Sequence, residues 1–398
     1  MSDWRTATVA QLEAEGSILV QDGNHGNDRP LASEFVEVGT PFIRAADISL
    51  GVVAFDHASR INSDAVSRIR KGHGRAGDSL LTHKGTVGKV AYVPLGSEPF
   101  VCSPQTTFWR STDPDVLDRR FLTYILQSPR FVAQLDSQKG ETDMAPYVSL
   151  TQQRSLRVDL PSIYEQQAIA EVLGALDDKI AANTALAGVA DELMHHSLLS
   201  ASSGPRVPLS LTANFVNGRA FTKGASGTGR VVVRIAELNA GISKSTVLSD
   251  ALVDDKHVAR PGDILFAWSG SLTLHRWFRD EAIVNQHIFK VIPGAGYPSW
   301  LIYELLRRKL SDFKAIAADK ATTMGHIQRH HLDELVELPS PEAVDQLNPL
   351  MSGLWHTVLN AQQESMTLTA TRDALLPQLM SGKLRVRDAE AAASAAGA

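Results

Sequence analysis

The sequence repeats itself, and this repeat limits the folds that the chain can adopt more than any other feature. The stretch PFIRAADISLGVV (residues 41–53) recurs as VVVRIAELNAGIS (231–243). The longer stretch GRAGDSLLTHKGTVGKVAYV (74–93) recurs as ARPGDILFAWSGSLTLHRWF (259–278), with a Gly-Asp pair and a later glycine in matching places. Because further similar blocks follow in the same order, each half of the chain is expected to be one copy of a single folding unit.

Each copy begins with a globular part and ends with a long helix. The globular parts alternate short β-rich runs with Gly and Pro turns and hold one short helix, which indicates a mixed domain. The helical parts carry inward positions at an average spacing of 3.5 residues, which is typical of a coiled coil, although an amphipathic core helix explains either one taken alone. We therefore expect an α+β fold with two pseudo-repeated α/β domains and two long helices that form an antiparallel coiled coil. The predicted inward positions are Ile169, Leu173, Leu176, Ile180, Leu347, Met351, Leu354 and Val358.

Changes in composition give the expected boundaries. SASSGPR (200–206) is typical of a linker, and the Ala-rich C-terminus is typical of a disordered tail. The expected segments are a first domain at 1–160, a first helix at 161–203, a second domain at 204–338, a second helix at 339–387 and a disordered tail at 388–398.

Composition indicates an ordinary globular protein. Hydrophobic residues make up 43% of the chain and charged residues 21%, which is the usual balance for such proteins. No apolar run approaches the roughly 20 residues of a membrane helix, and the first thirty residues lack an export signal. The single cysteine, Cys102, excludes an intrachain disulfide and a Cys-rich metal site, and we interpret it as a small core residue. We expect a cytoplasmic protein without a membrane partner.

Basic charge is concentrated locally, although the net charge is -5. Residues 60–89 carry seven Lys and Arg but only two acidic residues. Such a concentration is typical of a contact with a polyanion, and a solvated basic surface explains it equally well.

The stretch HKGTVGK (83–89) raises the alternative of a nucleotide-binding loop. A phosphate loop needs a glycine six residues before its lysine and a Ser or Thr directly after it. Those places hold His83 and Val90, and the second copy has Leu274 where the first has Lys89. The element common to both copies is a glycine-turned hairpin, and the side chains at its tip differ between the copies.

The hairpin tips and neighbouring loops supply the predicted DNA-binding residues. Side chains at base edges read sequence, whereas contacts to phosphates set the register. Exposed turns with incidental charge are the alternative, and Trp268 is interpreted as a core residue rather than a base-stacking one. The predicted contacts are Arg70, Lys71, Arg75, His83, Lys84, Thr86, Lys89, Lys139 and Thr142 in the first copy, and Asn217, Arg219, Arg260, Ser269, Ser271, His275, Arg276, Lys320 and Thr322 in the second.

Two segments resemble the spacers of type I restriction-modification specificity subunits: LPSIYEQQAIAEVLGALDDKIAANTAL (160–186) and DALLPQLMSGKLRV (373–386). The Gly-Asp hairpins resemble parts of that family's target recognition domains. The resemblance implies that each domain reads one half of a split site on double-stranded DNA and that the helical pair fixes the unread gap. It also implies two copies of a DNA methyltransferase and motor-nuclease restriction subunits as partners.

The resemblance places the chemistry in the partners, so this chain is expected to be no enzyme. Adenine methylation needs an Asn/Asp-Pro-Pro-aromatic pocket, and the sequence contains no Pro-Pro pair. S-adenosylmethionine and the flipped base are expected in the methyltransferase, and no cofactor is expected here. DELMHH (191–196) and HIQRHH (326–331) lack a third ligand of suitable spacing, so no metal is expected. The alternative function is a DNA-binding coiled-coil scaffold without sequence specificity in another phage-defence complex.

Overall fold

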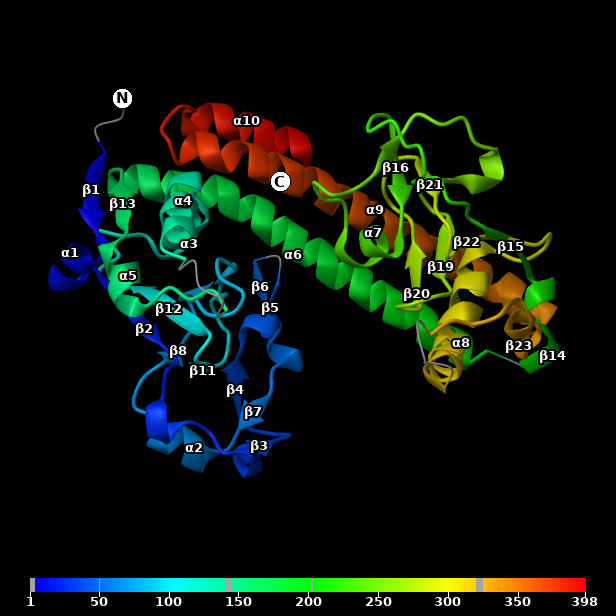
Figure 1. The fold of residues 1–398 in the computed structure, drawn as a ribbon, viewed down its shortest axis with the longest axis horizontal. Coiled ribbons are helices and arrows are strands. Elements are labelled where there is room, and N and C mark those ends of the chain that lie inside the picture. The colour runs from blue at the N-terminus through cyan, green and yellow to red at the C-terminus, as the bar shows by residue number, and fades with distance from the viewer. Residues whose placement is uncertain (1–3, 50, 140–144, 202, 320–324) are drawn as a thin grey trace. The chain divides into compact units, whose positions relative to one another are not determined.

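The computed structural model of the chain describes residues 4–49, 51–139, 145–201, 203–319 and 325–398. The chain divides into two compact units (Figure 1). Unit 1 comprises Met1–Lys179 with Leu368–Ala398, and unit 2 comprises Ile180–Thr367. Both units mix helices with sheets, which confirms the predicted α+β class.

Unit 1 is built on two sheets. The first is antiparallel with the strand order β10-β9-β12-β2, and the second has the order β3-β7-β4-β11-β8 with one parallel pair, β4 and β11. Ile43, Leu80, Phe100 and Phe108 come from both sheets and share one buried apolar cluster, so the sheets pack on each other. The strands are β2 (Ile18–Asp22), β3 (Phe35–Val36), β4 (Thr40–Ile43), β7 (Arg60–Ile61), β8 (His73–Gly74), β9 (Ser79–Thr82), β10 (Val90–Tyr92), β11 (Phe100–Cys102) and β12 (Thr106–Ser111).

Unit 2 has the same arrangement. Its antiparallel sheet has the order β15-β22-β19-β20, and its second sheet, β17-β16-β21-β18, again holds one parallel pair, β16 and β21. The cluster between the sheets contains Val233, Leu265, Ala282 and Ile288. The sequence repeat is therefore also a repeat of topology and core. The strands are β15 (Ala213–Asn217), β16 (Arg230–Val233), β17 (Leu248–Ser249), β18 (Val258–Ala259), β19 (Ile264–Ala267), β20 (Thr273–Arg276), β21 (Ala282–Val284) and β22 (Ile288–Pro293).

Shorter elements complete each unit. Two-stranded pairs join β1 to β13 in unit 1 and β14 to β23 in unit 2, and β5 pairs with β6. Their bounds are β1 (Arg5–Thr8), β5 (Ile48–Ser49), β6 (Val52–Val53), β13 (Arg157–Leu160), β14 (Ser203–Pro208) and β23 (Leu335–Pro339). The helices are α1 (Val9–Ala14), α2 (Ser63–Arg68), α3 (Arg119–Gln127), α4 (Pro129–Ser137), α5 (Leu150–Ser155), α7 (Ile235–Ala240) and α8 (Ser299–Asp319).

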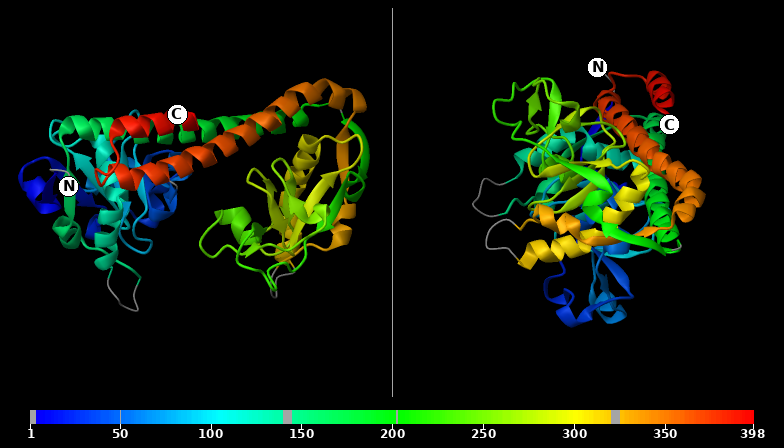
Figure 2. Two further views of the ribbon diagram at one scale, coloured as in Figure 1. Left: turned by 90° about the horizontal axis from the view of Figure 1, so that it is seen from above. Right: turned by 90° about the vertical axis from the view of Figure 1, so that its right-hand side faces the viewer.

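The two long helices are α6 (Ile163–Leu199) and α9 (Pro341–Leu379), and each contributes to both units. In unit 2 the two helices run antiparallel (Figure 2). Asn183 of α6 donates to Glu364 of α9 at 2.7 Å, whereas the later residue Leu193 of α6 lines the same pocket as the earlier residue Leu347 of α9. In unit 1 Arg372 pairs with Asp177 at 2.8 Å. Coiled-coil geometry itself stays a prediction. Of the predicted inward positions, five are buried and three half-buried: Ile169, Leu173, Leu176, Met351 and Val358, then Ile180, Leu347 and Leu354.

The prediction of a disordered tail at 388–398 is wrong, because these residues fall largely within helix α10 (Val386–Ala396). Alanine has the highest helix propensity of all residues. Ala389 and Ala393, four residues apart, lie on one helical face and are buried. Figures 1 and 2 show α10 beside the C-terminal part of α9. The small side chains therefore allow a close approach that composition alone does not indicate.

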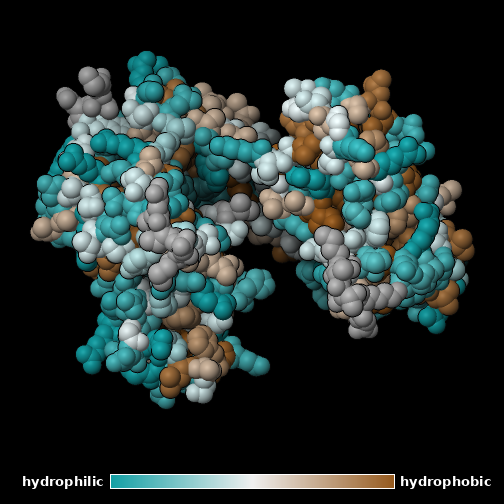
Figure 3. Space-filling view, viewed as in Figure 1, coloured by the Kyte–Doolittle hydropathy of each residue, from teal (hydrophilic) through white to brown (hydrophobic). Residues whose placement is uncertain are grey.

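Apolar side chains are exposed at the end of unit 1 that carries β3 (Figure 3). Phe35, Val36 and Val38 are exposed there, and β3 is an edge strand of its sheet.

Among the helices of the described residues, none is both long and apolar enough to cross a membrane.

Candidate nucleic-acid interface

The Gly-Asp turn at the start of each hairpin is held by the same bonds in both units. Asp78 accepts from the Arg75 backbone N–H at 2.8 Å, and Asp263 accepts from the Arg260 backbone N–H at 2.7 Å. The glycine before each aspartate has a positive φ, 84° in unit 1 and 91° in unit 2. Residues with a Cβ rarely adopt this conformation, so the recurring Gly-Asp pair is explained by the turn and not by a ligand.

Beyond this turn, the hairpin of unit 1 is fastened to two other loops. The His83 backbone N–H donates to the Gln105 carbonyl at 2.9 Å, and the Val148 N–H donates to the His83 carbonyl at 2.9 Å. At the tip, the Gly85 N–H donates to the Pro146 carbonyl at 2.9 Å. The hairpin tip, the loop before β12 and the segment before α5 therefore form one surface.

The hairpin of unit 2 makes the same three bonds with different residues. The Trp268 N–H donates to the His287 carbonyl at 3.1 Å, and the Ile327 N–H donates to the Trp268 carbonyl at 3.0 Å. The Gly270 N–H donates to the Gly325 carbonyl at 2.8 Å. The two units thus share one backbone framework of converging loops.

A fourth loop joins each framework through a glycine. A Cβ on Gly23 would lie 2.0 Å from the Cys102 carbonyl oxygen, and one on Gly218 would lie 2.0 Å from the Asn285 carbonyl oxygen. Only glycine permits so close an approach of two backbone segments. The loops after β2 and β15 are therefore fixed against the same neighbouring loop in both units.

In unit 1, five predicted DNA contacts are exposed around these loops. The Arg70 side chain is 89% exposed and lies 3.8 Å from Asp28, and the half-exposed Lys71 ammonium pairs with Asp22 at 3.0 Å. Since exposed ion pairs hold a cation only weakly, both groups can still meet a phosphate. The exposed set is Arg70, Lys71, Arg75, Lys84 and Thr86.

Two predicted contacts of unit 1 are corrected by the structure. The His83 imidazole is buried, and its Nδ1 lies 3.0 Å from the Val148 carbonyl oxygen. Burial lowers the pKa of His83, which favours the neutral ring. The Lys89 ammonium donates to the carbonyl groups of Ala45 at 2.9 Å and Ile48 at 2.8 Å. Both side chains stabilise the loops from within.

In unit 2, the exposed predicted residues are Asn217, Arg219 and Ser271. The predicted DNA contact of Ser269 is wrong, because this residue is only 6% exposed. Its backbone forms a β-bridge with His326.

The structure also corrects the predicted DNA contact of Arg276 in unit 2. This residue is 4% exposed and its guanidinium pairs with Asp191 of α6 at 3.0 Å. Arg276 also lies over the Trp355 ring, 3.9 Å from its centroid. The side chain is therefore turned toward the helices and away from solvent.

Two further predicted DNA contacts of unit 2 have polar groups that already interact with neighbouring side chains. Arg260 pairs with Asp255 at 2.6 Å and with Glu281 at 2.8 Å. His275 is half-buried, its Nε2 lies 2.8 Å from Thr273 Oγ1, and burial lowers its pKa. Both are weaker candidates for DNA contact than the exposed tip residues.

The remaining predicted loop is only partly described. Lys139 is half-buried and pairs with Asp136 at 2.5 Å. Thr142, Lys320 and Thr322 lie outside the described residues.

Several residues on the converging loops were not predicted from the sequence. Tyr147 bridges to Lys84 in unit 1, and its ring lies 5.5 Å from the His83 ring. In unit 2 the additional residues are His287, Gln328 and Arg329; His287 has a positive φ of 73°.

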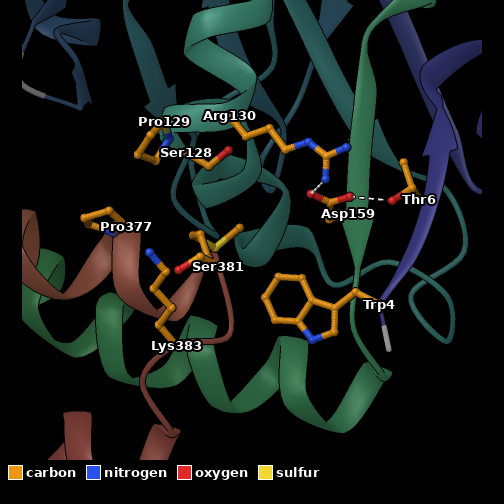
Figure 4. A pocket seen from close by; sticks show the side chains of 10 residues that line it. Trp4, Thr6, Ser128, Pro129, Arg130, Asp159, Pro377, Ser381 and Lys383 are labelled. Carbon is orange, nitrogen blue, oxygen red and sulfur yellow. Dashed lines mark hydrogen bonds and ion pairs between the residues drawn. The ribbon is translucent and has the colours of Figure 1, made fainter. Parts of the chain in front are cut away.

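A separate cavity of about 480 Å³ lies in unit 1 among β1, α4 and the end of α9 (Figure 4). Trp4, Arg130 and Lys383 line it, and Arg130 pairs with Asp159, which also accepts from Thr6 at 2.6 Å. The cavity is thus built from other elements than the converging loops.

No group of three or more His, Cys, Asp or Glu side chains suited to a metal ion occurs within the described part of the chain. Residues 326–328 are not helical, and a 3-10 helix covers Arg329–Asp333. His326 and His330 therefore do not lie on one face of a common helix.

Comparison with known proteins shows a family to which part of the chain is similar. Residues 21–187 match the type I restriction modification DNA specificity domain. The resemblance deduced from the spacer and hairpin segments is therefore confirmed: this part of the chain is similar to the DNA specificity domain of type I restriction-modification systems.

Two relatives and one solved structure illustrate the similarity. Over 90 residues the chain is 30% identical to the type I restriction enzyme MjaIX specificity subunit of Methanocaldococcus jannaschii, covering 22% of this chain and 20% of that protein. Over 183 residues it is 24% identical to the MjaVIII specificity subunit of the same organism, covering 45% and 40%. The alignments thus span less than half of either relative.

The crystal structure of the type I restriction-modification S subunit from M. genitalium has a similar fold. The TM-score is 0.58 at 15% sequence identity, covering 95% of this chain and 96% of that one. At this identity the similarity concerns the fold alone.

Proposed function

We propose that this chain recognises a two-part DNA site, with one loop set reading each half. The observation that carries this proposal is the shared framework of three backbone hydrogen bonds, which holds different side chains in the two units. At the tips, the exposed Lys84 stands where unit 2 has the buried Ser269, and Thr86 stands where unit 2 has Ser271. Side chains at base edges determine sequence preference, so a common scaffold with different side chains fits two different half-sites.

The charge around the loops of unit 1 supports DNA as the ligand. Arg70, Lys71, Arg75 and Lys84 are all exposed and cationic. Cations on phosphates supply affinity and position without reading sequence. The overall negative charge of the protein then disfavours contact with DNA through other faces.

The proposed partners perform the chemistry. Two copies of a DNA methyltransferase would bind the chain and methylate adenine with S-adenosylmethionine, and motor-nuclease subunits would cleave unmodified DNA. Helices α6 and α9 would set the length of the unread gap. A cytoplasmic location follows from the place of the host DNA. Each half-site can be bound weakly by its own unit, because once one unit is bound the second unit meets its half-site at a high effective concentration.

Mapping of methylated adenines tests the proposal. Co-expression of the chain with the methyltransferase from the same host is expected to methylate one bipartite sequence. Replacement of residues 84–87 by the four residues found at 269–272, with unit 2 left unchanged, is expected to change the preference in one half-site and leave the other half-site intact. Equal binding to all duplexes, without site-specific methylation, would instead support the DNA-binding scaffold without sequence specificity.

A further inference from the structure

The loop set of unit 2 contains an apolar recess of about 370 Å³. Trp268, Phe289 and Ile327 provide its apolar surface, and Asn217 and Gln328 provide polar groups. The recess lies where the hairpin tip meets the segment after α8, because the Ile327 N–H donates to the Trp268 carbonyl at 3.0 Å. It is therefore part of the surface proposed to face DNA.

Trp268 forms the aromatic wall of this recess. Its ring centroid lies 5.8 Å from that of Phe289 at an interplanar angle of 31°, and 5.2 Å from that of His287. Trp268 is half-buried, so it belongs partly to the core, as predicted, and partly to the surface. A half-buried indole next to a buried phenyl ring offers a rigid apolar surface to a methyl group or a ring.

The orientation of the Asn217 amide follows from its bond to this tryptophan. The Trp268 indole Nε1–H lies 2.9 Å from Asn217 Oδ1. An indole N–H only donates, so the amide oxygen must face it and the amide NH₂ must point elsewhere. Among the described residues this NH₂ makes no hydrogen bond. Asn217 therefore presents a donor beside the apolar wall.

The equivalent position in unit 1 is different. His83 takes the place of Trp268 in the backbone framework, and Tyr147 takes the place of His326. The His83 ring is buried and lies 5.5 Å from the Tyr147 ring. The chemistry of the recess therefore concerns only the half-site read by unit 2.

We propose that the recess recognises a thymine through its C5-methyl group and O4. In the major groove only thymine places a methyl group beside a hydrogen-bond acceptor. The wall of Trp268 and Phe289 fits the methyl group, and the Asn217 NH₂ fits O4. Arg219 and Arg329 are exposed on the adjoining loops, where they can meet the flanking phosphates. The inference rests on the proposed function, because it assigns one base within the half-site of unit 2.

Replacement of thymine by deoxyuridine tests the methyl contact. The full chain in complex with its methyltransferase is titrated with duplexes that carry the mapped site, with each thymine on either strand replaced in turn. One replacement in the half-site of unit 2 is expected to weaken binding about fourfold, as the loss of one buried methyl group predicts. A half-site without thymine, or one in which no replacement weakens binding, would overturn the inference.

Asn217→Asp tests the donor, because aspartate can still accept from Trp268 but offers no NH₂. Asn214→Asp on the same strand, with an exposed side chain, is the matched control for the added charge. Asn217→Asp is expected to weaken binding of the intact site roughly tenfold more than the control. Equal affinities would contradict the inference. If the complex instead binds every duplex alike, the proposed function itself fails, so the two failures are distinguishable.

Discussion

The guanidinium carbon of Arg276 lies 3.9 Å from the centroid of the Trp355 ring. The same guanidinium lies 5.1 Å from the Tyr303 ring and donates to Asp191 at 3.0 Å. One side chain of β20 thus contacts α6, α8 and α9 within unit 2. The contact explains why the last residue of a half-buried hairpin strand is fully buried.

Arg276→Ala is expected to lower the free energy of unfolding by about 3 kcal/mol, because it leaves Asp191 without its buried partner. Chemical denaturation of the full chain, followed by tryptophan fluorescence, measures the loss. Arg329→Ala is the control, since Arg329 is exposed and surface changes typically alter stability by about 0.5 kcal/mol or less. Equal stability of the two variants would show that Arg276 does not anchor the helices.

Lys84 and Lys89 are expected to behave differently, although both belong to the same hairpin. Lys84 is exposed, so Lys84→Met is expected to weaken binding to all duplexes and to reduce the salt dependence of binding by about one phosphate contact. Lys89 donates to two backbone carbonyls. Lys89→Met is therefore expected to lower stability by about 1–3 kcal/mol. Binding titrations at several salt concentrations, with denaturation of each variant, separate the two roles.

The opposite result for either lysine would be informative. A stable Lys89→Met protein with a reduced salt dependence would return Lys89 to the DNA-binding set. An unstable Lys84→Met protein would remove Lys84 from it.

The sequence predicted the repeat, the Gly-Asp hairpins and the two long helices because these depend on local patterns. It did not predict which tip residues face solvent, since His83 and Arg276 are turned inward by residues far away in the sequence, Val148 and Trp355. The recess was missed for another reason. Tyr147 and His326 hold equivalent places, because each forms a β-bridge with the hairpin tip of its own unit. In the sequence the two residues lie one position out of register with the repeat, so only the backbone hydrogen bonds reveal that they are equivalent.

Gly218 tests whether the loop framework is as tight as its geometry indicates. Gly218→Ala is expected to destabilise the protein by about 1–3 kcal/mol, because its Cβ would lie 2.0 Å from the Asn285 carbonyl oxygen. Gly188→Ala is the matched control on α6, where a Cβ meets no atom within 4 Å. The control is expected to stabilise the helix by about 0.5–1 kcal/mol. Similar changes in melting temperature for both variants would contradict the close approach of the two loops.

Glu304 gives unit 2 a defined dependence of stability on pH. Its side chain is fully buried; its Oε2 lies 2.9 Å from His195 Nδ1 and its Oε1 3.6 Å from Arg307 Nη1. Burial raises the pKa of Glu304 above 4.5, with Asp191 acting in the same direction and His195 and Arg307 acting against it. A raised carboxyl pKa stabilises the fold below pH 4.5, and this stabilisation is lost as the pH rises through the folded-state pKa.

Glu304→Gln removes this titration and keeps a side chain of similar size. The variant is expected to gain stability relative to the wild type as the pH rises above 4.5, because only the wild type loses a stabilising proton there. Urea unfolding at a series of pH values from 4.5 upward measures the difference in stability between the variant and the wild type. The control is Glu337→Gln, an exposed carboxyl on β23. If the difference between wild type and Glu304→Gln does not change with pH, the carboxyl has the same pKa in the folded and unfolded protein, and burial does not raise it.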